Sequence, residues 1–204
     1  MTCSRLTPEQ IEKTVAFHGH WCPGLALGLR AAELALNEVG HAGDEDIVAV
    51  VETDMCAVDA IQFLTGCTFG KGNLMYLDHG KTAFSFYRRK DGKAVRILAR
   101  PEAYGDLRKE MEPLHKKMLA GDLSKEEQQR LQEIRAEICD AIMRAPLEEI
   151  FLLKPVTRPA PKKARILKSL TCAACGEAVM ETRTRRFDEK TLCIPCFEVA
   201  EKRI

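Results

Sequence analysis

The chain has 204 residues, 46% of them hydrophobic and 30% charged, with a net charge of +1, and this balance is ordinary for a globular protein. Its length permits one domain with a sizeable core and a small appendage. The chain opens without an apolar signal segment and has no run of about 18 apolar residues, so we expect no membrane contact and a soluble protein.

Cysteine usage indicates the compartment. The chain contains nine cysteines, an odd number, and four of them fit the spacing of a metal site near the end of the chain. Structural disulfides are therefore not expected, and we predict a reducing, cytoplasmic location.

Two helices are predicted at the start of the chain. Residues 7–17 form the first, with Thr7 as its N-cap. Residues 23–38 form the second, which ends at Gly40. Small residues lie beside the apolar face of this second helix, namely Gly28, Ala31 and Ala35. They allow another helix to approach closely.

Strands and longer helices follow. The predicted strands cover residues 47–51, 74–77, 83–89 and 95–99, with an Asp91-Gly92 turn between the last two. The predicted helices cover residues 57–64, 104–119 and 125–143, and a capping box of Ser124 and Glu127 begins the last one. This order predicts an α+β fold in which helices pack on an antiparallel sheet. Long helices near a chain end often reach across to a second copy of the chain.

Three potential metal ligands lie between the first two predicted helices. His18, His20 and Cys22 occupy every second position, so on an extended segment their side chains would share one side. Cys22 would lie at a helix N-terminus, where the partial positive charge favours a thiolate. The alternative is a pair of surface imidazoles and a buried thiol. Because three such residues share five positions, we favour a site for metal or thiol chemistry.

A second group of polar residues follows the buried strand at 47–51. Cys56 is either a further soft ligand beside Cys22 or a buried structural cysteine. Asp59 is expected to cap the following helix or to hold an imidazole in one tautomer.

A glycine-rich loop at residues 65–73 contains Cys67 and Lys71. It does not have the spacing of a phosphate-binding P-loop, because three residues separate Gly66 from Gly70 and a glycine follows Lys71. Backbone N–H groups and Lys71 can still bind an anion. The alternative is a flexible loop with positive φ at its glycines.

A proline-rich and basic segment at residues 154–169 separates the core from the last part of the chain. It contains three prolines, six basic residues and no acid, which predicts a semi-rigid linker. Residues 154–204 together carry 12 Lys/Arg against 6 Asp/Glu, whereas residues 1–153 carry 19 against 24. These basic residues either keep the segment solvated, which is the interpretation we favour, or contact nucleic acid.

The strongest motif comes last. Two Cys-x-x-Cys pairs, separated by 17 residues, have the spacing of a four-thiolate structural zinc site. The four residues are Cys172, Cys175, Cys193 and Cys196. The alternative is two disulfides or four unrelated thiols. The spacing predicts a Zn²⁺ ribbon over residues 170–204, after a core domain at 1–153 and a linker at 154–169.

Three segments together resemble the FmdE family, which is named after a component of formylmethanofuran dehydrogenase: FHGHWCPG, TDMCAVDAIQ and TGCTFGKGN. The resemblance covers roughly residues 12–153, and the zinc ribbon is similar to an appendage that some members carry. It implies an α+β core that forms an intertwined homodimer. It also implies a core metal cluster of His18, His20, Cys22 and Cys56, with Cys67 and Lys71 in a nearby loop.

Two classes of function follow from these observations. The first is a metal-binding accessory or metal-handling protein linked to molybdenum or tungsten formylmethanofuran dehydrogenase or related one-carbon metabolism, with a second transition metal in the core. The second is a regulatory module whose ribbon and basic linker bind nucleic acid or protein while the core senses metal. We favour the first. The resemblance implies an accessory that does not hold the pterin cofactor, and the sequence identifies no catalytic residue, so it leaves open whether the protein catalyses a reaction.

Overall fold

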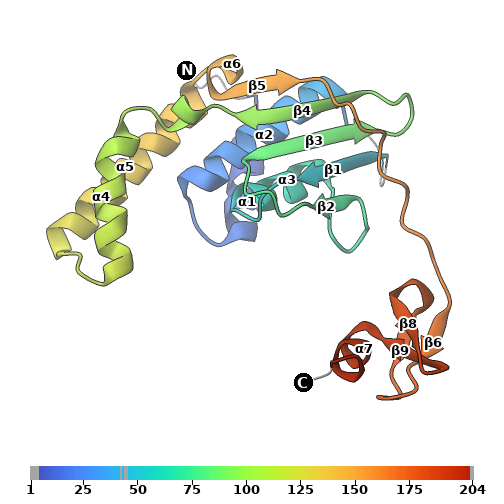
Figure 1. Ribbon diagram of the computed structural model, residues 1–204. Coiled ribbons are helices and arrows are strands. Elements are labelled where there is room, and N and C mark those ends of the chain that lie inside the picture. The colour runs from blue at the N-terminus through green and yellow to red at the C-terminus, as the bar shows by residue number, and fades with distance from the viewer. Residues whose placement is uncertain (1–4, 42, 44–45, 203–204) are drawn as a thin grey trace. The chain divides into compact units, whose positions relative to one another are not determined.

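The structure is a computed structural model that describes residues 5–41, 43 and 46–202 (Figure 1). The chain forms two compact units, Met1–Lys163 and Ala164–Ile204. Each unit has its own secondary structure and its own buried core.

The first unit is built on a five-stranded sheet with the order β2-β1-β3-β4-β5. Its strands are β1 (Ile47–Val51), β2 (Leu74–Tyr76), β3 (Ala83–Arg88), β4 (Ala94–Ala99) and β5 (Phe151–Lys154). Strands β1 and β2 are parallel, and all other neighbours are antiparallel. The expected α+β fold with an antiparallel sheet is confirmed, apart from this one parallel pair at the edge.

Helices cover one face of the sheet, as Figure 1 shows for α1, α2 and α3. The helices of this unit are α1 (Pro8–His18), α2 (Pro23–Val39), α3 (Ala57–Thr65), η1 (Pro101–Tyr104), α4 (Leu107–Ala120), α5 (Lys125–Arg144) and α6 (Leu147–Ile150). Helix α2 lies at the centre and is buried almost all round, including the ion pair of Arg30 with Glu33. The Arg30 guanidinium also donates to the Ala145 carbonyl at 2.6 Å, which ties α2 to the end of α5.

The close packing of α2 on α3 depends on a glycine. A Cβ atom at Gly28 would lie 2.5 Å from the Cα and carbonyl oxygen of Ala57, closer than real contacts allow. The expectation that small residues on α2 admit a second helix is therefore confirmed. Ala57 is the first residue of α3, so this contact also fixes the position of the preceding Cys56.

Helix starts follow the capping signals in the sequence. Thr7 and Gln10 form a capping box at α1, and Ser124 and Glu127 form one at α5. Each box satisfies backbone N–H groups that a helix N-terminus leaves without partners. Cys22 is the N-cap of α2, and its Sγ accepts from the N–H of Leu25 at 3.4 Å.

The other face of the sheet is partly covered by residues 155–161, which we call the proline strap. Val156 and Ala160 of the strap pack on an outer-face cluster of Val48, Val50 and Tyr87. The Arg89 guanidinium donates to the Pro161 carbonyl at 2.6 Å. Residues 154–163, which the sequence suggests as linker, thus belong to the first unit, because β5 pairs with β4 and the strap packs on the sheet.

The second unit consists of two hairpins and a short helix. Its elements are β6 (Ser169–Thr171), β7 (Ala178–Met180), η2 (Glu181–Arg183), β8 (Thr184–Phe187), β9 (Lys190–Cys193) and α7 (Ile194–Ala200). Strand β6 pairs with β7, and β8 pairs with β9. Its small core contains Cys172, Leu192 and Cys193. In neither unit does the described part of the chain contain a helix long and apolar enough to cross a membrane.

Two candidate metal centres

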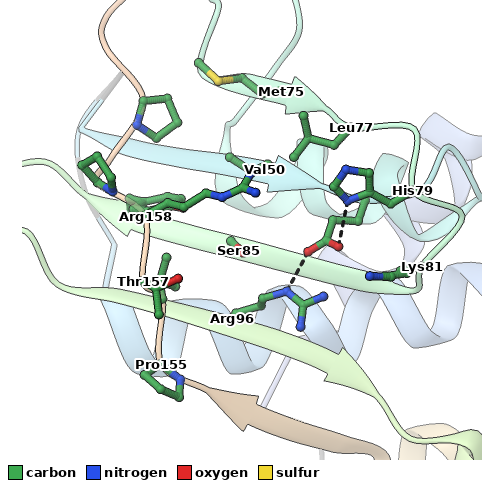
Figure 2. Close-up of a pocket in the computed structure, with 15 residues that line it drawn as sticks. Val50, Met75, Leu77, His79, Lys81, Ser85, Arg96, Pro155, Thr157 and Arg158 are labelled. Atoms are coloured by element: carbon green, nitrogen blue, oxygen red, sulfur yellow. Dashed lines mark hydrogen bonds and ion pairs between the residues drawn. The ribbon is translucent and has the colours of Figure 1, made fainter.

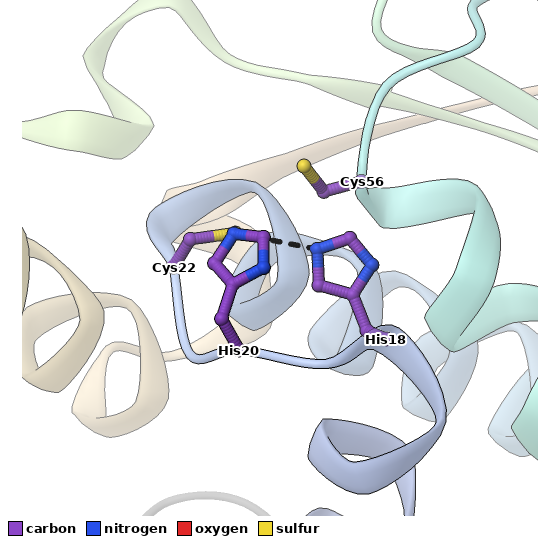
Figure 3. A group of neighbouring side chains, drawn as sticks. All are labelled: His18, His20, Cys22 and Cys56. Atoms are coloured by element: carbon purple, nitrogen blue, oxygen red, sulfur yellow. Dashed lines mark hydrogen bonds between the residues drawn. The ribbon is translucent and has the colours of Figure 1, made fainter.

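The core cluster forms where three helix ends meet (Figure 3). His18 is the last residue of α1, Cys22 caps α2, and Cys56 precedes α3. The expectation that the first ligands lie on one extended segment is wrong. Instead the helix containing His18 ends at Gly19, whose φ of +95° turns the chain so that His20 lies beside His18.

The geometry of the cluster suits a metal ion. One ligand atom from each of His18, His20, Cys22 and Cys56 lies within 4.8 Å of the other three. His18 Nε2 is 3.9 Å from Cys22 Sγ. In a tetrahedral site with metal–sulfur bonds of about 2.3 Å, two sulfurs are about 3.8 Å apart, so modest side-chain movements bring all four atoms into coordination range.

Asp59 sets the chemistry of His18. Its Oδ2 is 2.7 Å from His18 Nδ1, and α3 receives no side-chain cap. Of the two expected roles for Asp59, the structure favours the second, because the carboxylate contacts an imidazole and does not cap α3. With the proton on Nδ1, the Nε2 lone pair points to the cluster, as it does in carboxylate–histidine–metal arrangements.

The electrostatics of the cluster also favour a cation. Burial raises the pKa of the Cys56 thiol, and the neighbouring Cys22 raises it further. Two thiolates side by side are unfavourable without a positive charge between them. A divalent ion supplies that charge, and the imidazole–thiolate donor set suits zinc, nickel, copper or ferrous iron.

An open cavity of about 570 Å³ adjoins the cluster. His20, Cys22 and Cys56 line it on one side, and Tyr104, Arg108, Met111, His115 and Arg135 line it on the side of η1, α4 and α5. The sequence gives no signal for the residues on that second side, because they are scattered over three helices and share no motif. The cavity gives an exogenous molecule a route to the cluster.

Cys67 and Lys71 do not belong to this cluster. Cys67 is fully buried and its Sγ donates to the carbonyl of Ile47 at 3.4 Å, at the start of β1. Cys56 lies beyond the other end of β1 and at the opposite end of α3, a helix of nine residues or about 13 Å. The resemblance implied that this loop lies near the cluster, but the intervening helix separates the two.

The ribbon cluster gathers the four cysteines predicted from their spacing. One sulfur from each of Cys172, Cys175, Cys193 and Cys196 lies within 4.8 Å of the others. Cys175 Sγ and Cys193 Sγ are 4.0 Å apart, close to the separation in a tetrahedral four-sulfur site. Gly176 has a φ of +76°, which provides a tight turn directly after the first pair.

Backbone groups prepare the ribbon for a metal. N–H groups of Cys175, Cys193 and Ala174 lower the pKa of Cys172 to about 6. The neighbouring Cys193 and Cys175, in contrast, raise the pKa of Cys196 to about 12. One thiolate is thus stabilised by the fold, whereas four together need a cation such as Zn²⁺.

The fold and these clusters define a class of protein: an α+β core with an imidazole–thiolate cluster, followed by a four-cysteine zinc ribbon. Comparison with known proteins agrees. Residues 17–152 match the family model described as "FmdE, Molybdenum formylmethanofuran dehydrogenase operon". Residues 165–202 match the prokaryotic dksA/traR C4-type zinc finger. The chain belongs to the FmdE family and carries a C-terminal zinc finger.

Two relatives are informative. A crystal structure of a tungsten formylmethanofuran dehydrogenase FmdE-like protein from Syntrophus aciditrophicus is 29% identical, with a TM-score of 0.61, and the match covers 95% of this chain and 93% of that one. A probable S-adenosyl-L-methionine-binding protein of Archaeoglobus fulgidus is 36% identical over 188 residues. That match covers 88% of this chain and 50% of the relative, so this chain spans about half of the relative's length.

Proposed function

We propose that the protein is a metal-handling accessory of molybdenum or tungsten formylmethanofuran dehydrogenase or of related one-carbon metabolism. In this role the core cluster binds one transition ion through His18, His20, Cys22 and Cys56, and the ribbon binds a structural Zn²⁺. The observation that carries the proposal is the convergence of four N and S ligand atoms within 4.8 Å, with Asp59 orienting one of them.

The core site differs from a purely structural metal site because a cavity gives exogenous molecules access to it. Structural zinc sites are closed, whereas sites that exchange or activate a ligand keep an open position. The cavity beside the cluster leaves such a position. The proposal also requires reduced thiols, which fits a cytoplasmic location.

We further propose that the core forms a homodimer. Helix α4 has no buried residue in the single chain, although it carries Met118 and Leu119, which are 38% and 82% exposed. A second copy packed on the α4–α5 hairpin would bury these side chains.

The name of the Archaeoglobus relative includes a ligand, S-adenosyl-L-methionine. The match covers only half of that protein, so the proposed function does not include this ligand.

Metal stoichiometry tests the proposed core site. The full chain, expressed in zinc- and iron-supplemented medium, should contain two transition ions per chain by mass spectrometry of the metal content. The double variant His20→Ala and Cys22→Ala should contain one, held by the ribbon. His41→Ala and Cys67→Ala are the matched controls, since they remove an imidazole and a thiol outside the cluster, and both should retain two ions. Two ions in the double variant would contradict the proposal.

Exchange kinetics test the metal-handling role. Under a chromogenic chelator, the core ion should leave the full chain faster than the ribbon ion, because the core site opens to a cavity. The Cys193→Ser variant, which lacks the ribbon ion, identifies the core phase. If the core ion leaves more slowly than the ribbon ion, the site is structural.

A second candidate function concerns the ribbon. Arg183, Arg185 and Arg186 are exposed in the segment that matches a zinc finger, which favours contact with nucleic acid or an acidic protein surface. Retention on heparin measures this: phosphate-like contacts must weaken steeply with salt, and replacing the three arginines by glutamine should abolish the salt-dependent retention. Unchanged retention would exclude the ribbon as the contact surface.

A further inference from the structure

A second pocket lies on the opposite side of the sheet from the helices. Its volume is about 510 Å³ (Figure 2). The outer faces of β1 to β4 form its floor, and the proline strap forms a wall. The pocket thus lies within the first unit and is independent of the core cluster.

A buried carboxylate organises the floor of this pocket. Glu52 is 8% exposed, and Arg96 Nε donates to its Oε1 at 2.6 Å. His79 Nδ1 lies 3.1 Å from the other carboxylate oxygen. Both Glu52 oxygens are therefore engaged, and the ion pair holds Arg96 in the pocket lining.

Positive charge exceeds negative charge in the pocket. In Figure 2 the side chains of Arg158, Arg96 and Lys81 approach from three sides. Glu52 is the one carboxylate among the described lining residues, and no described acidic residue forms an ion pair with Lys81 or Arg158. At neutral pH the pocket therefore carries a surplus of about two positive charges, which an anion would neutralise.

Two hydroxyl groups add directional partners. Ser85 and Tyr87 are largely buried residues that line the pocket, and no hydrogen bond joins either hydroxyl to a described residue. Neither hydroxyl oxygen is among the fully buried polar atoms without a partner, so both are accessible from the pocket and free to donate to a bound molecule.

The remaining lining is apolar. Val50, Met75 and Leu77 line the pocket from the sheet side, and Val156 of the strap packs against the same apolar cluster. Pockets of this size, apolar with a few convergent polar groups, are typical of small-molecule sites. A bare inorganic ion would leave these side chains without a contact.

The geometry points to a binding site for a small organic anion, with its carboxylate or phosphate group between Lys81, Arg96 and Arg158 and its apolar body against Val50, Met75 and Leu77. The hydroxyls of Ser85 and Tyr87 donate to the anionic group. Because Arg158 belongs to the strap, a bound anion also fixes the strap on the sheet.

Isothermal titration of the full chain tests the site with phenyl phosphate and benzoate as probes. At least one of them should bind with a Kd of about 1 mM or lower, a weak complex suited to fragments. Arg158→Ala and Lys81→Ala should each raise the Kd about tenfold or more, and Tyr87→Phe should raise it less. Lys162→Ala and Lys90→Ala remove exposed cations that do not line the pocket, and both should bind as the wild type does.

Two further probes make the test decisive. Inorganic phosphate lacks the apolar body and benzyl alcohol lacks the charge, so each should bind at least tenfold more weakly than phenyl phosphate. Equal binding of inorganic phosphate, or of benzyl alcohol, overturns the proposal of an organic anion. So does the absence of binding by both anionic probes, or binding that Arg158→Ala and Lys81→Ala leave unchanged.

Discussion

Single side chains decide what the core cluster can bind. His18 would be an ordinary imidazole at the end of a helix if Asp59 did not hold its Nδ1 at 2.7 Å. That contact orients the ring and assigns the free lone pair to Nε2, the nitrogen that lies 3.9 Å from Cys22 Sγ. The carboxylate is therefore expected to act on the metal through His18 rather than by direct coordination.

Asp59→Asn should weaken the core metal site. Outer-shell partners of this kind typically contribute 10- to 100-fold in metal affinity, and an amide cannot hold the ring as a carboxylate does. Competition with a chelating dye measures the change on the full chain, where the ribbon ion serves as internal reference. Asp54→Asn is the control, because Asp54 is an exposed carboxylate of the same segment. An unchanged affinity in Asp59→Asn would contradict the role of the carboxylate.

The ionisation of Glu52 affects the stability of the folded protein. The hydrogen bond from Arg96 lowers the pKa of Glu52 below its ordinary 4.5, against the opposing effect of burial. The carboxylate therefore stabilises the folded protein above that ordinary pKa, and this contribution is lost as the pH falls through the lower pKa of the folded state.

Glu52→Gln should accordingly lower the free energy of unfolding at pH 7 by about 1–3 kcal/mol, since it leaves Arg96 without its charged partner. The difference from wild type should shrink in acid, below about pH 4. Urea unfolding at several pH values measures it, with the exposed Glu12→Gln as control. A difference that stays constant down to about pH 3 would show that packing, and not charge, is lost.

At the scale of elements, the core metal ligands are positioned by the ends of helices and not by their faces. Three of the four core ligands lie at the end of α1 or at the starts of α2 and α3, so the spacing of these helices sets the size of the cluster. The tight contact of Gly28 with Ala57 holds α3 against α2 and thereby places Cys56.

Gly28→Ala should separate α2 from α3. The added methyl would lie 2.5 Å from the Ala57 backbone, and overpacking of this kind costs about 1–3 kcal/mol or more. Core metal affinity should fall in the same variant because Cys56 moves with α3. Gly70→Ala is the control, as its Cβ would meet no atom within 4 Å. Thermal unfolding and metal competition measure both effects, and full affinity in Gly28→Ala would show that the helix contact does not set the site.

Most elements of the core were predictable from local sequence. The strand Ile47–Val51 and the caps at Thr7 and Ser124 depend on neighbouring residues alone. Strand β5 was not predictable, because its four residues pair with a strand that lies about fifty positions earlier. The strap has the sequence of a linker, because prolines exclude ladder hydrogen bonds but do not prevent packing of Val156 on a sheet.

The candidate sites were predictable to different degrees. The ribbon cysteines could be identified from spacing, since a zinc knuckle is a local structure. The ligand types of the core cluster were also identifiable, but their convergence through a left-handed Gly19 was not. The outer-face pocket could not be predicted, because Glu52, His79, Arg96 and Arg158 come from four separate segments and meet only when the sheet is assembled.

For the whole molecule, assembly is the first question. Light scattering of the full chain should give a mass of about twice 22.9 kDa if the proposed homodimer forms. Leu119→Lys should shift the protein toward the monomer, because it places a charge on the exposed apolar side of the α4–α5 hairpin. Val199→Lys changes a similarly exposed apolar residue of the ribbon and should leave the mass unchanged. A wild-type monomer at micromolar concentration would contradict the homodimer.

The second question is whether the ribbon can fold without a bound metal ion. Its described core contains three buried residues, two of them cysteines, which is too little apolar surface to offset the chain entropy of a unit of this size. Metal binding must then supply the folding free energy, as it does in zinc fingers. The core unit has its own extensive cluster of buried residues and does not need the ribbon metal.

Cys193→Ser should therefore release the ribbon Zn²⁺ and unfold Ala164–Ile204, while the melting transition of the first unit changes by no more than about 2 °C, an effect of at most about 1 kcal/mol. Calorimetry and metal analysis of the full chain measure the two effects together. Thr191→Ser is the control, since it alters a neighbouring position of β9 without removing a ligand. If Cys193→Ser also abolishes the transition of the first unit, the two units fold as one, and the ribbon is a part of the core rather than an independent metal-dependent module.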